Sequence, residues 1–227
     1  MRDRVFHRLS LVALGALSVG LLGWPAYTGA QTLGDITGTV GGAVGTVTGT
    51  VTGTVTGIVG GTTTVLGDTG TLAAGSLDSL YNEADSISAS LVSADVPSAR
   101  VIGYADEIAS ESYLASLNLT IAGITITASS AEAAARAALD GSSYDATSYV
   151  SNLSINGVAV LIDGTVNQTV SNPVGQLVIN EQQVLSDGTL VVNALHATVY
   201  GVADVVVASA VAGANGGNAY AVRATTP

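Results

Sequence analysis

Residues 152–208 alternate between apolar runs and short turn sequences, and this pattern constrains the fold more than any other feature of the chain. The runs LSINGVAVLI, TVNQTV, QLVINEQQVL and TLVVNALHATVYGVADVVVASA are rich in Val, Ile, Leu and Thr. Asn-Gly, Asp-Gly and Asn-Pro pairs interrupt them, and such pairs favour tight turns. The segment therefore predicts antiparallel strands joined by hairpins, with Asp163-Gly164 and Asp187-Gly188 as two of the hairpin turns.

A second strand pair precedes this segment. Apolar and polar residues alternate over 117–121 and again over 124–127, and Ala122-Gly123 separates them as a two-residue loop. The sequence SYLASLNLTIAGITI from Ser112 resembles SYVSNLSINGVAV from Ser148. This weak internal repeat, which places Tyr113 and Tyr149 at equivalent positions, predicts a duplicated β unit.

The segment 131–139, AEAAARAAL, has the composition of a helix, and Glu132 and Arg136 are spaced for a pair along one helix face. It nevertheless continues the strand that begins at residue 124 and precedes the second hairpin. A sandwich needs a return path there, and alanine does not forbid a strand, so we favour a strand over a helix.

These patterns divide the chain into five parts. We expect a signal peptide over 1–30, a Gly/Thr/Val-rich low-complexity spacer over 31–70, and a short helix or an extended arm over 71–97. An all-β, antiparallel β-sandwich-like domain then covers 98–214, and a polar C-terminal tail covers 215–227. The helix is suggested by apolar residues three and four apart from Leu77 to Leu91, with Ser76 as the N-cap and Pro97 beyond the end.

The first thirty residues have the features of a secretory signal. Three arginines precede the apolar run Leu9–Gly23, and Thr28-Gly29-Ala30 has small residues at the cleavage positions. The run is short for a membrane span, although an uncleaved anchor helix is the alternative. We therefore expect an exported protein, extracellular or at the cell surface, with no membrane span after cleavage.

The spacer contains the sequence TVTG three times over residues 46–57. Three interpretations remain open: a flexible and Thr-rich spacer, a β-forming assembly segment, or a helix with glycines four apart. The first has the best compositional support, because glycine weakens both helix and strand preference in its neighbours.

Charge and cysteine content exclude several classes of function. The chain carries 17 acidic and six basic residues. Without the first thirty residues, only Arg100, Arg136 and Arg223 remain as cations. A strongly acidic chain without a basic stripe argues against nucleic-acid binding and against adhesion to anionic membranes. Because the chain has no cysteine, disulfide scaffolds and thiolate metal sites are also excluded.

The search for catalytic chemistry depends on His196, the only histidine beyond the signal segment. Simple alternation places His196 on the apolar face of its strand with Val192 and Ala194, and places Asn193 and Leu195 on the opposite face. A histidine so placed is more often structural than catalytic, and no nucleophile motif accompanies it. We predict no catalytic, cofactor or metal site, and we note one polar cleft candidate: Asn180, Glu181, Asn193 and His196.

Ligand binding has weaker support in the sequence. Asp163, Asp187 and Asp204 lie in or near expected turns, but their spacing fits no EF-hand or repeat calcium motif. The chain beyond the signal segment has no Trp to stack on sugars, although tyrosines remain. They include Tyr104, Tyr113, Tyr144, Tyr149 and Tyr200.

Several of these strands resemble the choice-of-anchor P family of bacterial exported proteins. The resemblance runs over roughly 91–213, and its more specific pieces are Asn180-Glu181-Gln182 and Val192-Asn193-Ala194-Leu195-His196. It implies a secreted or surface module. Relatives carry C-terminal sorting signals, whereas residues 215–227 are short and polar, so covalent anchoring is not expected here.

The sequence therefore favours a secreted or cell-surface structural and interaction module without catalytic activity or cofactor. Long apolar strands would allow it to associate with itself or with other components of the cell envelope. The alternative is an extracellular ligand-binding module for a glycan or Ca²⁺.

Overall fold

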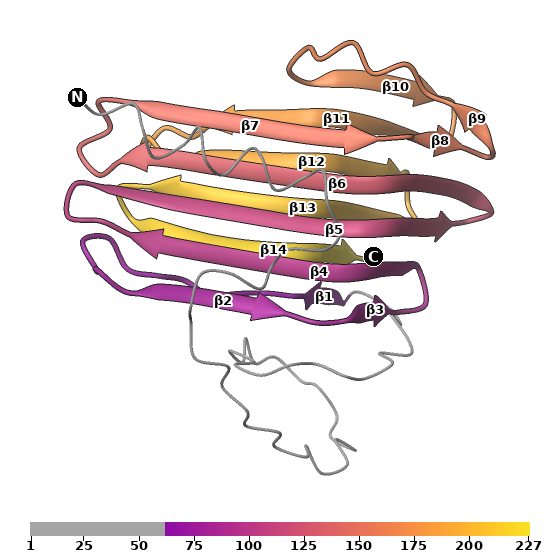
Figure 1. The fold of residues 1–227 in the computed structure, drawn as a ribbon. Coiled ribbons are helices and arrows are strands. Elements are labelled where there is room, and N and C mark those ends of the chain that lie inside the picture. Colours follow the sequence, from indigo (N-terminus) through magenta and orange to yellow (C-terminus); the bar gives the residue numbers. More distant parts are fainter. Residues whose placement is uncertain (1–61) are drawn as a thin grey trace. The chain divides into compact units, whose positions relative to one another are not determined.

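A computed structural model describes residues 62–227, which form two antiparallel β-sheets packed face to face (Figure 1). The predicted all-β, sandwich-like fold is confirmed. The signal peptide predicted over 1–30 and the TVTG repeats lie outside the described residues. Among the residues described, no helix has the length and hydrophobicity needed to cross a membrane.

One sheet has eight strands and contains the first half of the domain. Its spatial order is β2-β4-β5-β6-β8-β9, with β3 also paired to β4 and β7 also paired to β6. The strands are β2 (Ser79–Glu83), β3 (Ser86–Ser88), β4 (Val92–Gly103), β5 (Glu107–Ile121), β6 (Ile124–Ala138), β7 (Tyr144–Ser151), β8 (Ser154–Ile155) and β9 (Val158–Ala159).

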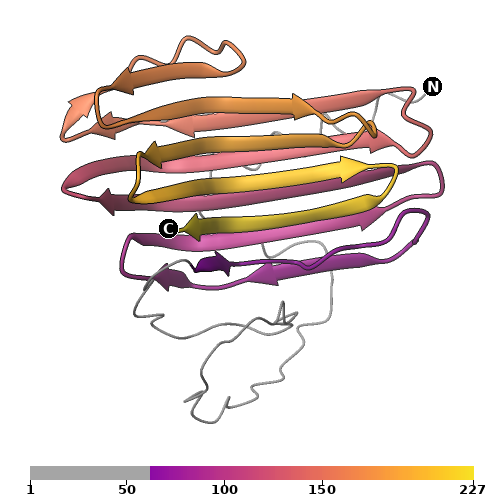
Figure 2. The same cartoon turned by 180° about the vertical axis from the view of Figure 1, so that it is seen from behind.

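The other sheet has six strands, in the order β1-β14-β13-β12-β11-β10 (Figure 2). They are β1 (Thr63–Leu66), β10 (Gln168–Asn172), β11 (Gly175–Val184), β12 (Leu190–Val199), β13 (Ala203–Gly213) and β14 (Gly216–Thr225). The chain thus makes one meander, crosses to the second sheet between β9 and β10, and makes another. The first described strand, β1, pairs with the last, β14.

Most of the predicted turns form as expected. Ala122 and Gly123 both have positive φ and join β5 to β6, and Asn156 and Gly157 do the same between β8 and β9. Asp187-Gly188 joins β11 to β12. Asp163-Gly164 is different, because it lies in the connection between the two sheets rather than in a hairpin. There the Asp163 carboxylate accepts hydrogen bonds from the backbone N–H and the hydroxyl of Thr165.

The strand prediction for 131–139 is confirmed, because β6 continues to Ala138. Ala131, Ala133, Ala135 and Ala137 are all buried and face the other sheet, where β12 and β13 lie opposite. In this segment, packing between the sheets outweighs the helix propensity of alanine. An alanine row removes apolar surface from water while leaving room for the larger Val and Leu side chains of the facing strands.

The helix predicted within 71–97 is wrong, since this segment forms β2, β3 and the start of β4. Leu80 pairs with Val101 of β4, and the side chain of buried Asn82 donates a hydrogen bond to the carbonyl of Asp68. Ladder bonds to β4 satisfy the backbone here, and a short isolated helix has no comparable partner. The β domain therefore begins well before residue 98.

The polar tail expected over 215–227 is also wrong. Residues 216–225 form β14, which lies between β1 and β13 and buries Ala219, Ala221 and Val222. The glycines at the start of β14 have a packing role. A Cβ atom on Gly217 would lie 2.8 Å from the carbonyl oxygen of Val211, so only glycine allows this approach.

The long strands of both sheets change the side that faces the core at one point along their length. In β5 the buried residues run to Leu114 and resume at Leu117, three residues later, and Ser116 has a φ of 51°. The equivalent residue of the repeat, Asn152, directly follows β7 and has the same φ. A left-handed residue rotates the strand, so the residues beyond it exchange faces. The same conformation recurs at Val96 in β4, Asn180 in β11 and Ala208 in β13.

Candidate functional site

The change of face decides where His196 points. Ile179 pairs with Leu195 and Glu181 with Asn193, which places left-handed Asn180 opposite Ala194 of β12. Ala194 and Leu195 are both fully buried, so the inward series shifts by one residue between them. His196 therefore projects from the outer face of the six-stranded sheet, together with Asn193. The predicted placement of His196 with Val192 and Ala194 on the apolar face is wrong.

On this outer face the imidazole of His196 lies between two carboxylates. Its Nδ1 is 2.9 Å from Oε2 of Glu181, and its Nε2 is 2.9 Å from Oδ2 of Asp204. Each of the two carboxylates also accepts a second hydrogen bond. The side chain of Asn193 donates to Glu181 at 2.6 Å, and the hydroxyl of Thr198 donates to Asp204 at 3.1 Å. We call these five residues the His196 cluster.

The electrostatics of the cluster favour a charged histidine. The hydrogen bond to Glu181 is the largest cause that raises the pKa of His196 to about 9; burial opposes the rise, and the bond to Asp204 adds to it. The reciprocal hydrogen bond from His196 lowers the pKa of Glu181. At neutral pH the group is therefore an imidazolium held by two carboxylates, each of which accepts one ring N–H.

The structure brings together three of the four residues of the predicted polar cleft. Glu181, Asn193 and His196 are in contact, whereas Asn180 turns away. The Asn180 side chain donates to the carbonyl of Thr165 at 3.4 Å and accepts from Gln182 at 2.7 Å, so it fastens the connection between the sheets.

Asp204 is the member of the cluster that sequence reasoning missed, because it was noted only as lying in or near a turn. It lies in β13, where it pairs with Thr198 across the Tyr200-Gly201 turn. Counting outward from that turn would have put Asp204 beside Thr198. The contact with His196 additionally requires the outward orientation of His196, which alternation alone did not predict.

A cation and an aromatic ring extend the row towards β14. Arg223 lies in register with Val206, which itself pairs with His196, and its guanidinium is 5.5 Å from the centre of the Tyr220 ring. Burial raises the pKa of Tyr220. Arg223 also helps to lower the pKa of Glu181. The outer face of this sheet thus carries acidic and basic side chains near one another.

This arrangement has little room for chemistry. Both ring nitrogens of His196 are bound to carboxylates, and a protonated imidazole has no lone pair with which to act as a base. Glu181 and Asp204 bind opposite edges of the ring, so the three groups do not converge on one ion. Among residues 62–227, no group of three or more His, Asp or Glu side chains has the arrangement of a metal site.

The other two calcium candidates also hold turns. Asp163 binds Thr165 as described above, and Asp187 accepts from the backbone N–H of Thr189 and from the side chain of Asn215. These bonds lower the pKa of both carboxyl groups. Asp163 and Asp187 are each bound within their own turn, and Asp204 is bound to His196, so the three do not form one site.

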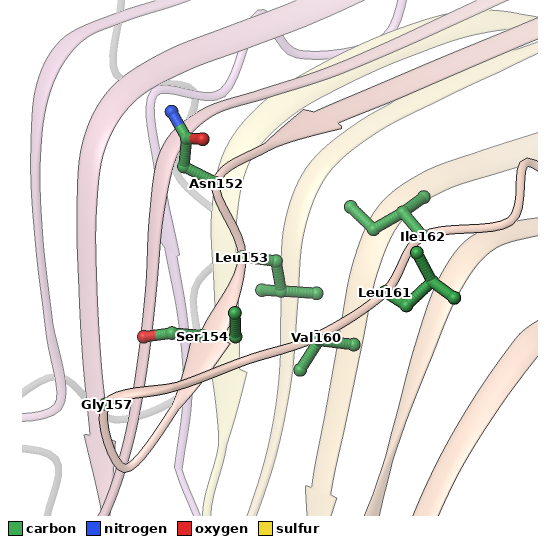
Figure 3. Close-up of a pocket in the computed structure, with 8 residues that line it drawn as sticks. Asn152, Leu153, Ser154, Gly157, Val160, Leu161 and Ile162 are labelled. Carbon is green, nitrogen blue, oxygen red and sulfur yellow. The ribbon is translucent and has the colours of Figure 1, made fainter.

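A shallow hollow of about 410 Å³ lies at the edge where the chain crosses between the sheets (Figure 3). The side chains of Leu153, Val160, Leu161 and Ile162 line it, and Leu161 is 84% exposed. The hollow is formed by the β8–β9 hairpin and the segment that follows it. Its lining is mostly apolar, with Asn152 and Ser154 as polar members, and has no charged side chain.

A scan of protein-family models, a search of curated proteins and a search of solved structures each found no match to this chain. The resemblance to choice-of-anchor P proteins therefore stays a prediction.

Proposed function

We propose that this chain is an exported, non-catalytic structural module that associates with a second copy of itself through the edge strand β10. The observation that carries the proposal is the difference between the two sides of the sandwich: one edge is neutral and partly apolar, and the other is acidic. Export rests on the signal features of residues 1–30, and detection of the native chain in the medium or on the cell surface tests it.

The neutral edge is an available β-strand. β10 pairs with β11 on one side, and no other described strand pairs with it. The sequence 165–172, TVNQTVSN, has no charge, proline or glycine. Such a segment at a sheet edge presents backbone groups to another strand, and edge strands normally carry charge to prevent this.

The near absence of charge favours contact at this edge. Asp163 is the only charged residue between Asp145 and Glu181. The strands at the other side, β2 and β3, include or adjoin Asp78, Glu83 and Asp85. In a strongly acidic protein, two copies repel each other least where their facing surfaces carry no charge. A symmetric β10–β10 contact uses the same edge of both copies, so a closed dimer is expected rather than a fibre.

The apolar hollow adds contact area beside β10. Leu161 and the neighbouring Val158 and Val166 are exposed on the same connection between the sheets. A second copy paired with β10 would remove part of this surface from water, which is favourable by roughly 25 cal/mol per Å².

The His196 cluster supports the non-catalytic part of the proposal. Its histidine is fully bound and charged, and it therefore stabilises the sheet rather than providing a reactive group. Replacing His196 would then affect stability, as argued in the Discussion.

Placing charged residues on β10 tests whether the dimer forms through this strand. In a symmetric antiparallel pair centred on Val170, Thr169 of one copy lies opposite Ser171 of the other. The double variant Thr169→Lys/Ser171→Lys would place like charges opposite each other and is expected to be monomeric by sedimentation velocity. The matched control, Ser86→Lys/Ser88→Lys on exposed β3, should remain dimeric like the unmodified chain.

A mixing experiment separates a broken interface from a damaged fold. Thr169→Glu/Ser171→Glu should also be monomeric alone, and an equimolar mixture with the lysine variant should restore dimers. The proposal is wrong if the unmodified chain is monomeric at high concentration, or if the lysine variants on β10 and β3 sediment alike.

A further inference from the structure

The outer face of the eight-stranded sheet has a row of aromatic and acidic side chains that the proposed dimer does not use. Tyr113 of β5 pairs with Glu132 of β6, and Glu132 pairs on its other side with Tyr149 of β7. Both neighbours of Tyr113 and of Glu132 along the strand are buried, and so is Val150 beside exposed Tyr149, so all three side chains point outward. A carboxylate thus lies between two tyrosine rings on neighbouring strands.

A third tyrosine lies beside this row. Tyr81 of β2 pairs with Arg100 of β4, whose neighbour on β5 is Glu111, so Tyr81 is displaced from the row by two residues. Tyr113 and Tyr149 lie in register on β5 and β7, with β6 between them. Because adjacent strands lie about 4.8 Å apart, rings on alternate strands are roughly 10 Å apart across the sheet. Tyr81 is 57% exposed and Tyr149 55% exposed.

Polar groups fill the spaces between these rings. Arg100 donates to Glu111 at 3.2 Å, and the guanidinium of Arg136 binds Glu107 nearby. Burial, followed by the nearby charge of Glu111, raises the pKa of Glu132. The carboxylates on this face outnumber the two arginines. An anionic ligand would therefore be repelled, whereas hydroxyl groups would find acceptors between the rings.

We propose that this face binds an extended, uncharged β-1,4-linked polysaccharide, with its sugar rings stacked on Tyr113 and Tyr149. In such a chain alternate sugars present the same face, so stacking platforms are needed at every second sugar. Tyr113 on β5 and Tyr149 on β7, which lie in register two strands apart, meet this requirement. Glu111 and Glu132 accept hydrogen bonds from the intervening hydroxyls, and tyrosine supplies a flat ring with little loss of side-chain entropy.

The proposed site lies on a different sheet from β10 and the His196 cluster. Polysaccharide binding and dimerisation can therefore fail separately, and the Thr169→Lys/Ser171→Lys monomer should bind each polysaccharide through the same row of rings.

The test is co-sedimentation of the full chain with insoluble cellulose and insoluble chitin, with soluble alginate examined separately by titration calorimetry. We expect binding to at least one neutral polymer and none to alginate. Tyr149→Ala and Tyr113→Ala should each weaken binding about tenfold, which corresponds to one lost stacking contact. Tyr149→Phe should retain binding because it keeps the ring.

Tyr200→Ala is the matched control, since Tyr200 is exposed in the turn between β12 and β13, outside the row. Circular dichroism checks that each variant is folded. The proposal is overturned if the unmodified chain stays in solution with both neutral polymers. Equal binding by folded Tyr149→Ala and Tyr200→Ala would overturn it as well.

Discussion

At the scale of the residue, the two carboxylates around His196 make this histidine a charged structural group. Glu181 and Asp204 lie on the same outer face as Asn193 and Thr198, which donate hydrogen bonds to them. The Oδ1 atom of Asn193 is buried and has no hydrogen-bond partner among the described residues, which adds to the free-energy cost of burying the His196 cluster. The ion pairs offset that cost only while the imidazole is protonated.

This gives a pH-dependent stability. The pKa of His196 rises from 6.5 in the unfolded chain to about 9 in the folded one. Its contribution is therefore complete below about pH 6.5 and is lost as the pH rises through 9. His196→Gln is expected to lower the free energy of unfolding by about 2 kcal/mol at pH 6, after allowance for solvent screening. Urea denaturation at pH 6, 8 and 10 measures the difference between the two proteins.

The difference should shrink towards pH 10, where the unmodified chain has also lost the charge on His196. If the difference in free energy of unfolding between the two proteins stays constant from pH 6 to pH 10, the stabilisation does not come from the imidazolium.

At the scale of the element, β6 shows how packing overrides propensity. Its buried face is built almost entirely from alanine, and its outer face carries Glu132, Ala134 and Arg136. The small residues face β12 and β13 of the other sheet. The strand was predictable from its context between two hairpins, although its composition favours a helix.

A pair of neighbouring substitutions tests the alanine face. Ala133→Leu would place a large side chain into a fully buried site and is expected to cost about 1–3 kcal/mol of stability through overpacking. Ala134→Leu, the adjacent residue on the outer face, should change stability by no more than about 0.5 kcal/mol. Urea denaturation compares the two, and similar losses for both would show that the face does not constrain residue size.

At the scale of the whole molecule, the ends of the domain complete the six-stranded sheet. β14 separates β1 from β13, and its buried residues are part of the common core. The domain therefore depends on pairing between residues far apart in the chain, such as Thr63 with Thr225.

Removal of residues 214–227 tests this dependence. Without β14, β13 loses one ladder and the core loses Ala219, Ala221 and Val222, so we expect no cooperative thermal unfolding transition by circular dichroism. Removal of residues 226–227 alone, beyond the end of β14, should keep the transition within a few degrees of the full chain. A cooperative transition in the shorter variant would show that β14 is dispensable.

The sequence alone determined the fold class and many local features of this protein. Alternating apolar residues and positive-φ turn pairs are local preferences, so the strands from 117 onward and the turns at Ala122-Gly123 and Asn156-Gly157 were predictable. The helix within 71–97 and the tail over 215–227 were wrong because their strands form only by pairing with distant partners. The polar group Glu181, Asn193 and His196 was identified, but for reasons that did not include its geometry.

Only the tertiary structure decided which way the side chains of that group point. Left-handed residues at Val96, Ser116 and Ala208 have no strong local preference for that conformation, and Val96 is branched at Cβ, which disfavours it further. The pairing and packing of whole sheets impose it. Each such residue exchanges the faces of the strand beyond it. β12 has no left-handed residue, but its Ala194 lies between Asn180 of β11 and Ala208 of β13, and its buried face also shifts there, so His196 lies on the outer surface beside Asp204.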